Sequence, residues 1–393
     1  MLPARIDRTV VRRTLILGVA AGLLLRGLVA SAAMPVLITI DTETSSGCSA
    51  DGCFPGPLSG RIYGVKDGRI YGIALVMDLL EKHGMRGTFF VNAYLDSWYP
   101  EDDVAEMVRG IISRGHDVQF HAHAEFRCFR RCDPRDHDCR LRCLGRDGGT
   151  AGTSFENQLE VLREGARNIE RWTGHYPVAF RGGALRADAN TLRALAALNI
   201  KIDSSFSGPG HELEGVLPVN QLTLHEGVLE MPLLAYGENL PLISRVRFLD
   251  QESSIEQEQI YLLDQAAKMG IGAVPLIMHS FSFCDPELVC PVPKHVERFD
   301  ALLGSIARQP ERFTVMTMRE FWAAYERNPQ AYLLPPSGKM PTVSYWLVLR
   351  RSLARFDQGW MNVAFLFANL VAAVALLLAA AWGVRRFSRG NSS

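Results

Sequence analysis

Residues 173–183 have the sequence TGHYPVAFRGG and lie between two helical patterns. The helix before them is predicted over 155–173, where apolar residues recur every three or four positions. Thr153 and Glu156 have the spacing of a capping box in front of this helix, and Gly174 supplies a residue type that often ends one. The apolar run that follows then predicts a strand, so the stretch marks a helix-to-strand junction.

Apolar strands and helical patterns alternate in both directions from this junction. The predicted strands cover 36–43, 87–92, 116–124, 178–183, 200–206, 228–236, 274–281 and 313–318. The predicted helices cover 73–82, 104–113, 155–173, 189–198, 255–269 and 296–306. Because each helix separates two strands, the pattern predicts an α/β fold with a largely parallel sheet or barrel.

Two of these strands end in pairs of side chains that can bind a metal ion. Asp41 and Glu43 lie two residues apart at the end of one strand, and His121 and His123 do so at the end of another. Residues two apart share one face of a strand, and the carboxyl ends of parallel strands meet at one edge of a sheet. Two imidazoles and one carboxylate leave a coordination position open for water, as in hydrolytic zinc sites.

Three further strand ends also carry ionisable side chains inside otherwise apolar runs. These are Arg181, Asp203 and His279. A charge buried in a fold is costly unless it is paired or coordinated, so folding alone does not explain so many at one edge. The pattern therefore predicts a functional site at the carboxyl ends of the strands.

The ordered set of motifs resembles the NodB-type polysaccharide deacetylases from about Val36 to Phe321. The stretch 173–183 is similar to the family's TGxxPxxFR segment, and the later strand 200–206 contains a DSS sequence like the family's own. GTFFVN at 87–92 and GHDVQFHAH at 115–123 match its second strand and its metal-histidine motif. The resemblance implies a deformed (β/α) barrel of about seven strands, one divalent metal ion, expected to be zinc, and hydrolysis of N-acetyl groups on a glycan.

The same resemblance implies a role for each matching residue. Asp41 is expected to be the catalytic base and His279 the catalytic acid. Arg181 is expected to orient the base, and Asp203 is expected to accompany the acid and raise its pKa.

Two departures from the family pattern concern the metal ligands. The family usually has adjacent aspartates in its first motif, whereas a threonine separates Asp41 from Glu43 here. Its second histidine usually follows four residues after the first, and here that position is Glu125, with His123 between. We expect Glu43, His121 and His123 to bind the metal; Glu125 is the alternative to His123, which strand parity favours.

Charge and motif content leave three functions open. Lys plus Arg equals Asp plus Glu at 42 each, so no basic field exists that would attract nucleic acid. The favoured function is a metal-dependent deacetylase of a polysaccharide or lipopolysaccharide. The alternatives are a metal-dependent amidase acting on a non-sugar amide and a catalytically inactive, membrane-tethered protein that binds glycans.

Both ends of the chain have features of membrane targeting. Residues 1–33 combine a basic start, an apolar run and a final Ala-Ser-Ala, which predicts a signal peptide or an uncleaved N-terminal anchor. Residues 361–384 carry no charge, which predicts a transmembrane helix, and the basic tail 385–393 should then lie in the cytoplasm. The catalytic domain 34–330 would face the periplasm or the exterior, joined to the span by a membrane-proximal linker over 331–360.

The cysteines agree with that topology, because all 8 lie between the two apolar segments. They are Cys48, Cys53, Cys128, Cys132, Cys139, Cys143, Cys284 and Cys290. Their spacing does not fit a zinc ribbon, and disulfides persist outside the cytoplasm. Proximity pairs Cys48 with Cys53 and Cys284 with Cys290, and the middle four are left unassigned.

Overall fold

The structure is a computed structural model, in which the fold begins at Met34. The described residues are 33–44, 46–49, 52–129, 132–133, 136, 151–239, 244–284, 290–333, 340–354 and single helical residues between 364 and 382. The predicted signal segment lies outside them except for its last residue, and the predicted basic tail lies wholly outside them.

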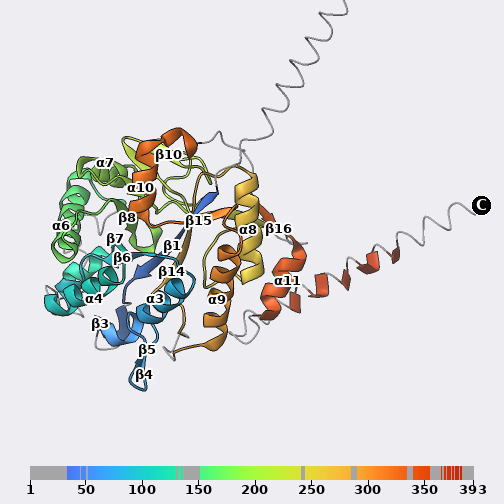
Figure 1. The fold of residues 1–393 in the computed structure, drawn as a ribbon, viewed down its shortest axis with the longest axis horizontal. Helices are drawn as coiled ribbons and strands as arrows, with labels where there is room; N and C mark the ends of the chain where they lie inside the picture. The colour runs from blue at the N-terminus through green and yellow to red at the C-terminus, as the bar shows by residue number, and fades with distance from the viewer. Residues whose placement is uncertain are drawn as a thin grey trace, which may run out of the picture. The chain divides into compact units, whose positions relative to one another are not determined.

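A nine-stranded sheet forms the centre of the fold (Figure 1), in the order β10-β11-β9-β8-β7-β6-β1-β14, with β15 paired to β1. The strands are β1 (Met34–Thr42), β6 (Thr88–Asn92), β7 (Asp117–Ala122), β8 (Ala179–Gly182), β9 (Ile202–Asp203), β10 (Thr223–His225), β11 (Val228–Glu230), β14 (Val274–His279) and β15 (Phe313–Val315). All pairings in this sheet are parallel except that of β10 with β11. The predicted α/β fold with a largely parallel sheet is confirmed.

Helices connect the strands, as the alternation predicted. They are α2 (Leu58–Arg61), α3 (Ile73–Lys82), α4 (Glu101–Ser113), α6 (Phe155–Thr173), α7 (Ala189–Ala197), α8 (Glu256–Lys268), α9 (Pro293–Ala307), α10 (Met318–Arg327) and α11 (Tyr345–Ala354), with short 3₁₀ turns at η1 (Leu95–Ser97), η2 (Ala124–Cys128), η3 (Gly183–Leu185) and η4 (Pro329–Ala331). Gly174 ends α6 in the left-handed region, at φ 74°. The expected capping box is wrong, because the N-cap of α6 is Ser154, whose side chain accepts from the amide of Asn157.

The sheet is curled, and two backbone hydrogen bonds partly close it. Leu249 N donates to Leu234 O, just beyond β11, over 2.9 Å. Gln251 N donates to Ile277 O in β14, also over 2.9 Å. The short segment 249–251 therefore joins the β11 side of the sheet to the β14 side. This half-barrel gathers the carboxyl ends of the strands around one space.

Three small sheets lie outside the central one. They are β13-β12-β16 (Ser244–Phe248, Ala235–Asn239, Thr342–Val343), β2-β3 (Ser46–Ser49, Gly52–Pro55) and β4-β5 (Val65–Lys66, Arg69–Ile70). The first of them corrects the predicted strand 228–236, which the structure divides between β11 in the main sheet and β12 in this one. Pro232 lies in the break between the two strands, and because proline disfavours the interior of a strand, it is a sequence signal for this break.

Part of the predicted linker 331–360 is packed against the rest of the chain. The buried side chain of Arg351 in α11 donates to Glu238 of β12 and Glu258 of α8, each over 2.5 Å. Both carboxylates are also buried. Removing one member of such a buried cluster leaves an uncompensated charge, which typically costs about 3–5 kcal/mol. Helix α11 is therefore held firmly on the domain.

The structure contains the predicted disulfide between Cys284 and Cys290. Cys128 and Cys132 are also disulfide-bonded, whereas Cys139 and Cys143 lie outside the described residues. Positions 48 and 53 are cross-strand partners in β2 and β3, but their side chains are likewise outside the description.

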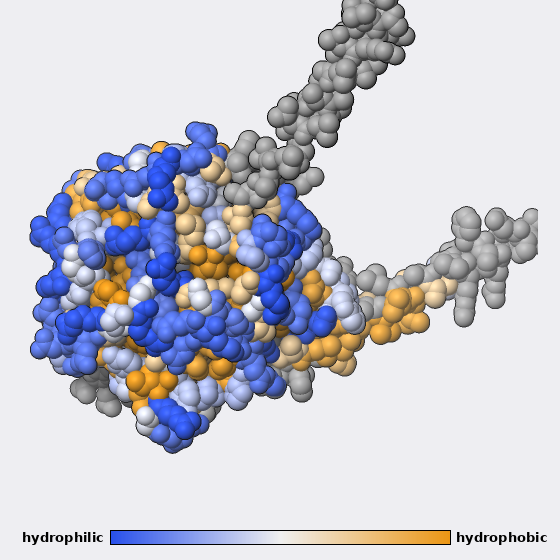
Figure 2. Space-filling view, in the orientation of Figure 1, coloured by the Kyte–Doolittle hydropathy of each residue, from blue (hydrophilic) through white to orange (hydrophobic). Residues whose placement is uncertain are grey.

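The predicted transmembrane helix over 361–384 is described only at scattered positions. Within the described part of the chain, no helix has the combined length and apolarity needed to cross a membrane. The described positions of this segment carry exposed large apolar side chains, including Phe367, Leu377 and Trp382. Figure 2 shows orange, hydrophobic residues along the described part of the chain's C-terminal extension.

Candidate metal and catalytic site

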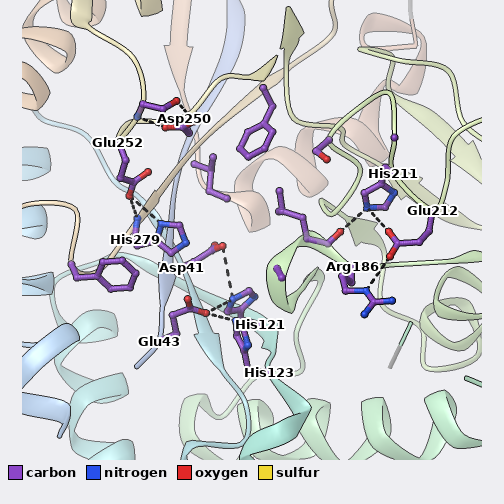
Figure 3. A pocket seen from close by; sticks show the side chains of 18 of the residues that line it. Asp41, Glu43, His121, His123, Arg186, His211, Glu212, Asp250, Glu252 and His279 are labelled. Atoms are coloured by element: carbon purple, nitrogen blue, oxygen red, sulfur yellow. Dashed lines mark hydrogen bonds and ion pairs between the residues drawn. The ribbon is translucent and has the colours of Figure 1, made fainter. Parts of the chain in front are cut away.

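A cavity of about 810 Å³ opens where β1, β7 and β14 end (Figure 3). Five of the predicted site residues line it: Asp41, Glu43, His121, His123 and His279. The other two predicted residues, Arg181 and Asp203, are fully buried and do not line it. The strand-end argument therefore located the cavity correctly.

Three predicted ligands converge on one point of the cavity wall. One donor atom from each of Glu43, His121 and His123 lies within 4.8 Å of the other two. His121 Nε2 is 2.9 Å from Glu43 Oε2, and His123 Nε2 contacts the same oxygen. Glu43 and His123 each lie one residue beyond their strand, so two strand ends and the backbone just past them form the group.

The hydrogen bonding of His121 shows that this group suits a cation. Its Nδ1 lies 2.9 Å from the backbone oxygen of Arg181, which can only accept, so Nδ1 carries the hydrogen. In the neutral ring Nε2 then presents a lone pair to the carboxylate of Glu43, which is also an acceptor. Two acceptors 2.9 Å apart repel each other unless a proton or a metal ion lies between them. The site therefore fits a divalent metal ion.

Electrostatics at the group keep its carboxylate ionised. Burial raises the pKa of Glu43, but the neighbouring His123 and His121 hold that pKa well below its usual value. Burial would lower the pKa of His123, yet Glu43 and Glu125 raise it well above the ordinary range. The carboxylate is thus kept ionised, the form that binds metal.

Glu125, the alternative ligand, contacts the other side of His123. Its Oε1 lies 2.7 Å from His123 Nδ1, whereas His123 Nε2 faces Glu43. A carboxylate on the far nitrogen of a histidine fixes the ring and its tautomer. The geometry thus favours His123 as the ligand and Glu125 as the residue that orients it.

Asp41 is held by a buried arginine. Arg181 Nη1 donates to Asp41 Oδ1 over 2.6 Å and to Thr39 Oγ1 over 3.0 Å. Its Nε and Nη2 donate to the backbone oxygen and the hydroxyl of Ser204, and its guanidinium lies 4.3 Å from the centre of the Phe90 ring. The second oxygen of Asp41 lies 3.9 Å from His121 Nε2. Arg181 therefore fixes one oxygen of Asp41 and leaves the other beside the metal group.

His279 is paired with Glu252, a residue that the sequence analysis missed. Glu252 Oε1 accepts from the backbone amide of His279 over 2.9 Å and lies 3.0 Å from His279 Nδ1. Burial would lower the pKa of His279, but the charge and hydrogen bond of Glu252 raise it to about 9. The ring also stacks on Phe281, with the ring centres 4.9 Å apart. The pairing with Glu252 thus favours the protonated form of His279.

The expected partnership of Asp203 with His279 is corrected by the structure. Asp203 is paired in register with Glu230 of β11, and both carboxyl groups are buried. Ser205 Oγ donates to Asp203 over 2.6 Å. Burial, together with the charge of Asp203, raises the pKa of Glu230 well above its usual value. The DSS sequence supports the strands behind the site, and Glu252 takes the place expected of Asp203.

The identity of the fold follows from a comparison with protein families. Residues 71–202, about a third of the chain, match the family model described as polysaccharide deacetylase. Residues 71–202 are thus similar to polysaccharide deacetylases. The matched residues include His121, His123 and Arg181. The strands that carry Asp41 and His279 lie outside the matched residues. None of the curated proteins compared with the chain matches it.

Solved structures that are similar to this chain share little sequence with it. A protein from Mycobacterium smegmatis, described as a polysaccharide deacetylase, has 16% identity and a TM-score of 0.49, with 80% of this chain and 96% of that chain covered. A similarly described protein from Pseudomonas aeruginosa PAO1 has 13% identity and a TM-score of 0.48, with coverages of 76% and 92%. A CE4 family pseudoenzyme from Bacillus anthracis has 11% identity and a TM-score of 0.39, with coverages of 74% and 66%.

Proposed function

We propose that this protein is a metal-dependent hydrolase that removes N-acetyl groups from an envelope or extracellular glycan. The observation that carries the proposal is the convergence of Glu43, His121 and His123, whose donor atoms lie within 4.8 Å of one another. The family match supports the reaction type.

Glu43, His121 and His123 would hold one divalent ion, and zinc suits two imidazoles with one carboxylate. Such an ion, when bound, polarises the acetyl carbonyl and makes a water molecule more acidic. The residues around the ligands support this assignment, because Glu125 and the backbone oxygen of Arg181 each fix one imidazole.

Asp41 has the position of a general base. Its free oxygen lies on the cavity side of the Arg181 pair, so it can take a proton from the water that attacks the acetyl carbon. Arg181 keeps the carboxylate oriented, as the resemblance implied.

His279 has the position and the charge of a general acid. Glu252 occupies its Nδ1, which leaves the Nε2 hydrogen available to the cavity. The C–N bond of the acetamide breaks as this proton passes to the leaving nitrogen, and the products are acetate and an amine. Asp203 has no part in this step, and Glu252 maintains the protonated state.

The two ion pairs favour an enzyme over an inactive glycan-binding protein. Asp41 with Arg181 and His279 with Glu252 form an oriented base and an oriented acid on one cavity. A protein that only bound glycans would not need an oriented base and an oriented acid on the same cavity.

Acetate release from purified envelope polysaccharides, lipid-linked sugars and chitooligosaccharides tests the proposal. We expect release by the metal-loaded wild type and at least about 10²-fold slower release by Asp41→Asn, which loses the base. The variant keeps the side-chain volume, so its metal content should match wild type. Release from simple peptide amides but from no glycan would instead establish the amidase alternative.

The location is also a proposal. The uncharged segment 361–384 would anchor the chain in a membrane, with the deacetylase domain on the periplasmic or extracellular side. The exposed apolar side chains at its described positions support this. A phosphatase reporter fused after Ser393 should be inactive, because that end is then cytoplasmic; an active fusion would overturn the topology.

A further inference from the structure

The wall of the cavity opposite the metal group is built around Arg186 and Glu212 (Figure 3). Arg186 Nε lies 3.0 Å from Glu212 Oε1, and the two side chains are 59% and 37% exposed. Neither residue contacts a group assigned above to the reaction. Both lie on segments that follow strands of the central sheet, β8 and β9 respectively.

A tightly constrained turn presents Arg186 to the cavity. Ala184 and Leu185 have φ values of 51° and 60°, a region that side chains other than glycine rarely adopt. A Cβ atom on Gly182 would lie 2.0 Å from the backbone oxygen of Arg186, so the turn closes on a glycine. Strained backbone of this kind persists at sites where the surroundings hold it in place.

His211 fastens this turn to the segment that carries Glu212. Its Nδ1 accepts from the amide of Leu213 over 3.1 Å, and its Nε2 donates to the backbone oxygen of Leu185 over 2.6 Å. Its ring also meets the edge of Phe206, with centres 5.4 Å apart. Because both nitrogens are occupied, His211 is structural here, and the positions of Arg186 and Glu212 are fixed relative to each other.

The charges on the cavity wall limit which sugars it can accept. Arg186 is the sole lysine or arginine among the described lining residues, and Glu212 already neutralises it. The lining carboxylates are Asp41, Glu43, Glu212, Asp250 and Glu252. An acidic sugar would therefore meet no unpaired cation on this wall, and it would face the carboxylate of Glu212.

An uncharged sugar meets suitable groups on the same wall. The guanidinium makes no other hydrogen bond to the described residues, so its remaining N–H groups can donate to hydroxyls. Glu212 Oε2 lies 3.6 Å from His211 Nε2 and keeps a lone pair that can accept from a hydroxyl. Phe248, which lines the same cavity, adds an apolar surface for the C–H face of a ring. The cavity volume of about 810 Å³ lies in the range of sites for ligands much larger than one acetamide.

We propose that Arg186 and Glu212 form a subsite for an uncharged sugar unit next to the one being deacetylated, and that Glu212 discriminates against acidic sugars. This assignment rests on the proposed function, because the subsite is defined relative to the sugar that is deacetylated. It deepens that function by naming the substrate class, a glycan with neutral units beside its N-acetylated residue.

Binding measurements on the full-length, metal-loaded chain test the subsite independently of catalysis. Calorimetry would compare a chitooligosaccharide with an oligosaccharide of alternating N-acetylglucosamine and glucuronate. Wild type should prefer the neutral ligand. Arg186→Ala should weaken its binding by about five- to tenfold, since hydrogen bonds from a charged group are lost at a half-exposed position. Glu212→Gln keeps the shape and frees the guanidinium, so the relative affinity for the acidic ligand should rise by a similar factor.

Arg171→Ala is the matched control, because Arg171 forms an exposed pair with Glu101 on helices away from the cavity. It should leave both affinities unchanged. Melting temperatures show whether Arg186→Ala disturbs the turn. If it does, the change in ligand preference of Glu212→Gln tests the subsite instead.

The outcomes separate the subsite from the reaction. Unchanged affinities in both cavity variants, tighter wild-type binding of the acidic ligand, or no binding of either ligand would each overturn the subsite. If the affinities shift as expected while no glycan releases acetate, the subsite stands and the proposed function fails. If acetate is released but neither variant alters binding, the proposed function stands and the subsite fails.

Discussion

His121 donates its Nδ1 hydrogen to the backbone oxygen of Arg181, and the side chain of that same arginine holds Asp41 at 2.6 Å. One residue thus positions a proposed metal ligand through its main chain and the proposed base through its guanidinium. The two functions can be separated experimentally, because substitution changes the side chain and leaves the carbonyl in place.

Arg181→Lys should reduce activity without loss of metal. Lysine keeps the positive charge beside Asp41, but it cannot reproduce the guanidinium fork that also reaches Thr39 and Ser204. We expect kcat to fall by about 10- to 100-fold, since a misplaced base loses most of its contribution. Metal analysis and steady-state kinetics check this. A metal-free Arg181→Lys protein that remains folded would contradict the separation.

His121→Ala and His279→Ala should be inactive for different reasons. The first removes one of three proposed ligands and should lose metal, whereas the second should retain it and lose about 10²- to 10⁴-fold in rate. In the same series, His123→Ala should lose metal. Glu125→Gln should keep the three ligands and only weaken metal binding by about 10- to 100-fold. Elemental analysis of folded proteins decides the matter; a metal-free His279→Ala would reverse the assignments.

The pH profile should reveal the pairing of His279 with Glu252. The acid must be protonated, so activity should fall as pH rises through the pKa of His279, which Glu252 raises to about 9 against the effect of burial. Glu252→Gln removes the charge that raises this pKa, and the alkaline limb of kcat should move to lower pH. Asp203→Asn is the control, because Asp203 pairs with Glu230 instead. An equal shift in both variants would argue against a specific role for Glu252.

Gly183→Ala should weaken metal binding through His123. A Cβ atom at this position would lie 2.9 Å from His123 Nδ1 and 2.7 Å from the backbone oxygen of Ala122, so the ring must move. Moving a ligand this way should lower metal affinity by about tenfold or more. Gly110→Ala is the matched control, since a Cβ there meets nothing within 4 Å. Competition with a chelator measures both, and equal affinities would exclude the steric effect.

The sequence predicted those parts of the site that depend on local spacing. Glu43, His121 and His123 could be found because residues two apart share a strand face and parallel strands end together. Their contacts with Glu125 and with the carbonyl of Arg181 depend on ring orientation, which spacing does not specify. The main strands and helices were likewise found from apolar periodicity.

The residues that were missed depend on tertiary arrangement. Glu252 reaches His279 because segment 249–251 bonds to β14, a pairing that no local pattern reveals. Asp203 was misassigned because its neighbour, Glu230, is set by the register between β9 and β11. The two-residue spacing of Asp250 and Glu252, which repeats that of Asp41 and Glu43, was a signal that could have marked this loop.

The buried contacts of Arg351 have a consequence for the distance at which the proposed deacetylase could work from a membrane. Helix α11 ends at Ala354, and only residues 355–360 precede the segment proposed to span the membrane. Six extended residues reach at most roughly 20 Å. Because Arg351 holds α11 on the domain, α11 cannot unwind to lengthen that tether without breaking a buried ion cluster. The proposed anchor would thus keep the domain close to the bilayer, where it could act on glycans attached to lipid or newly delivered across the membrane, and out of reach of polymers further away.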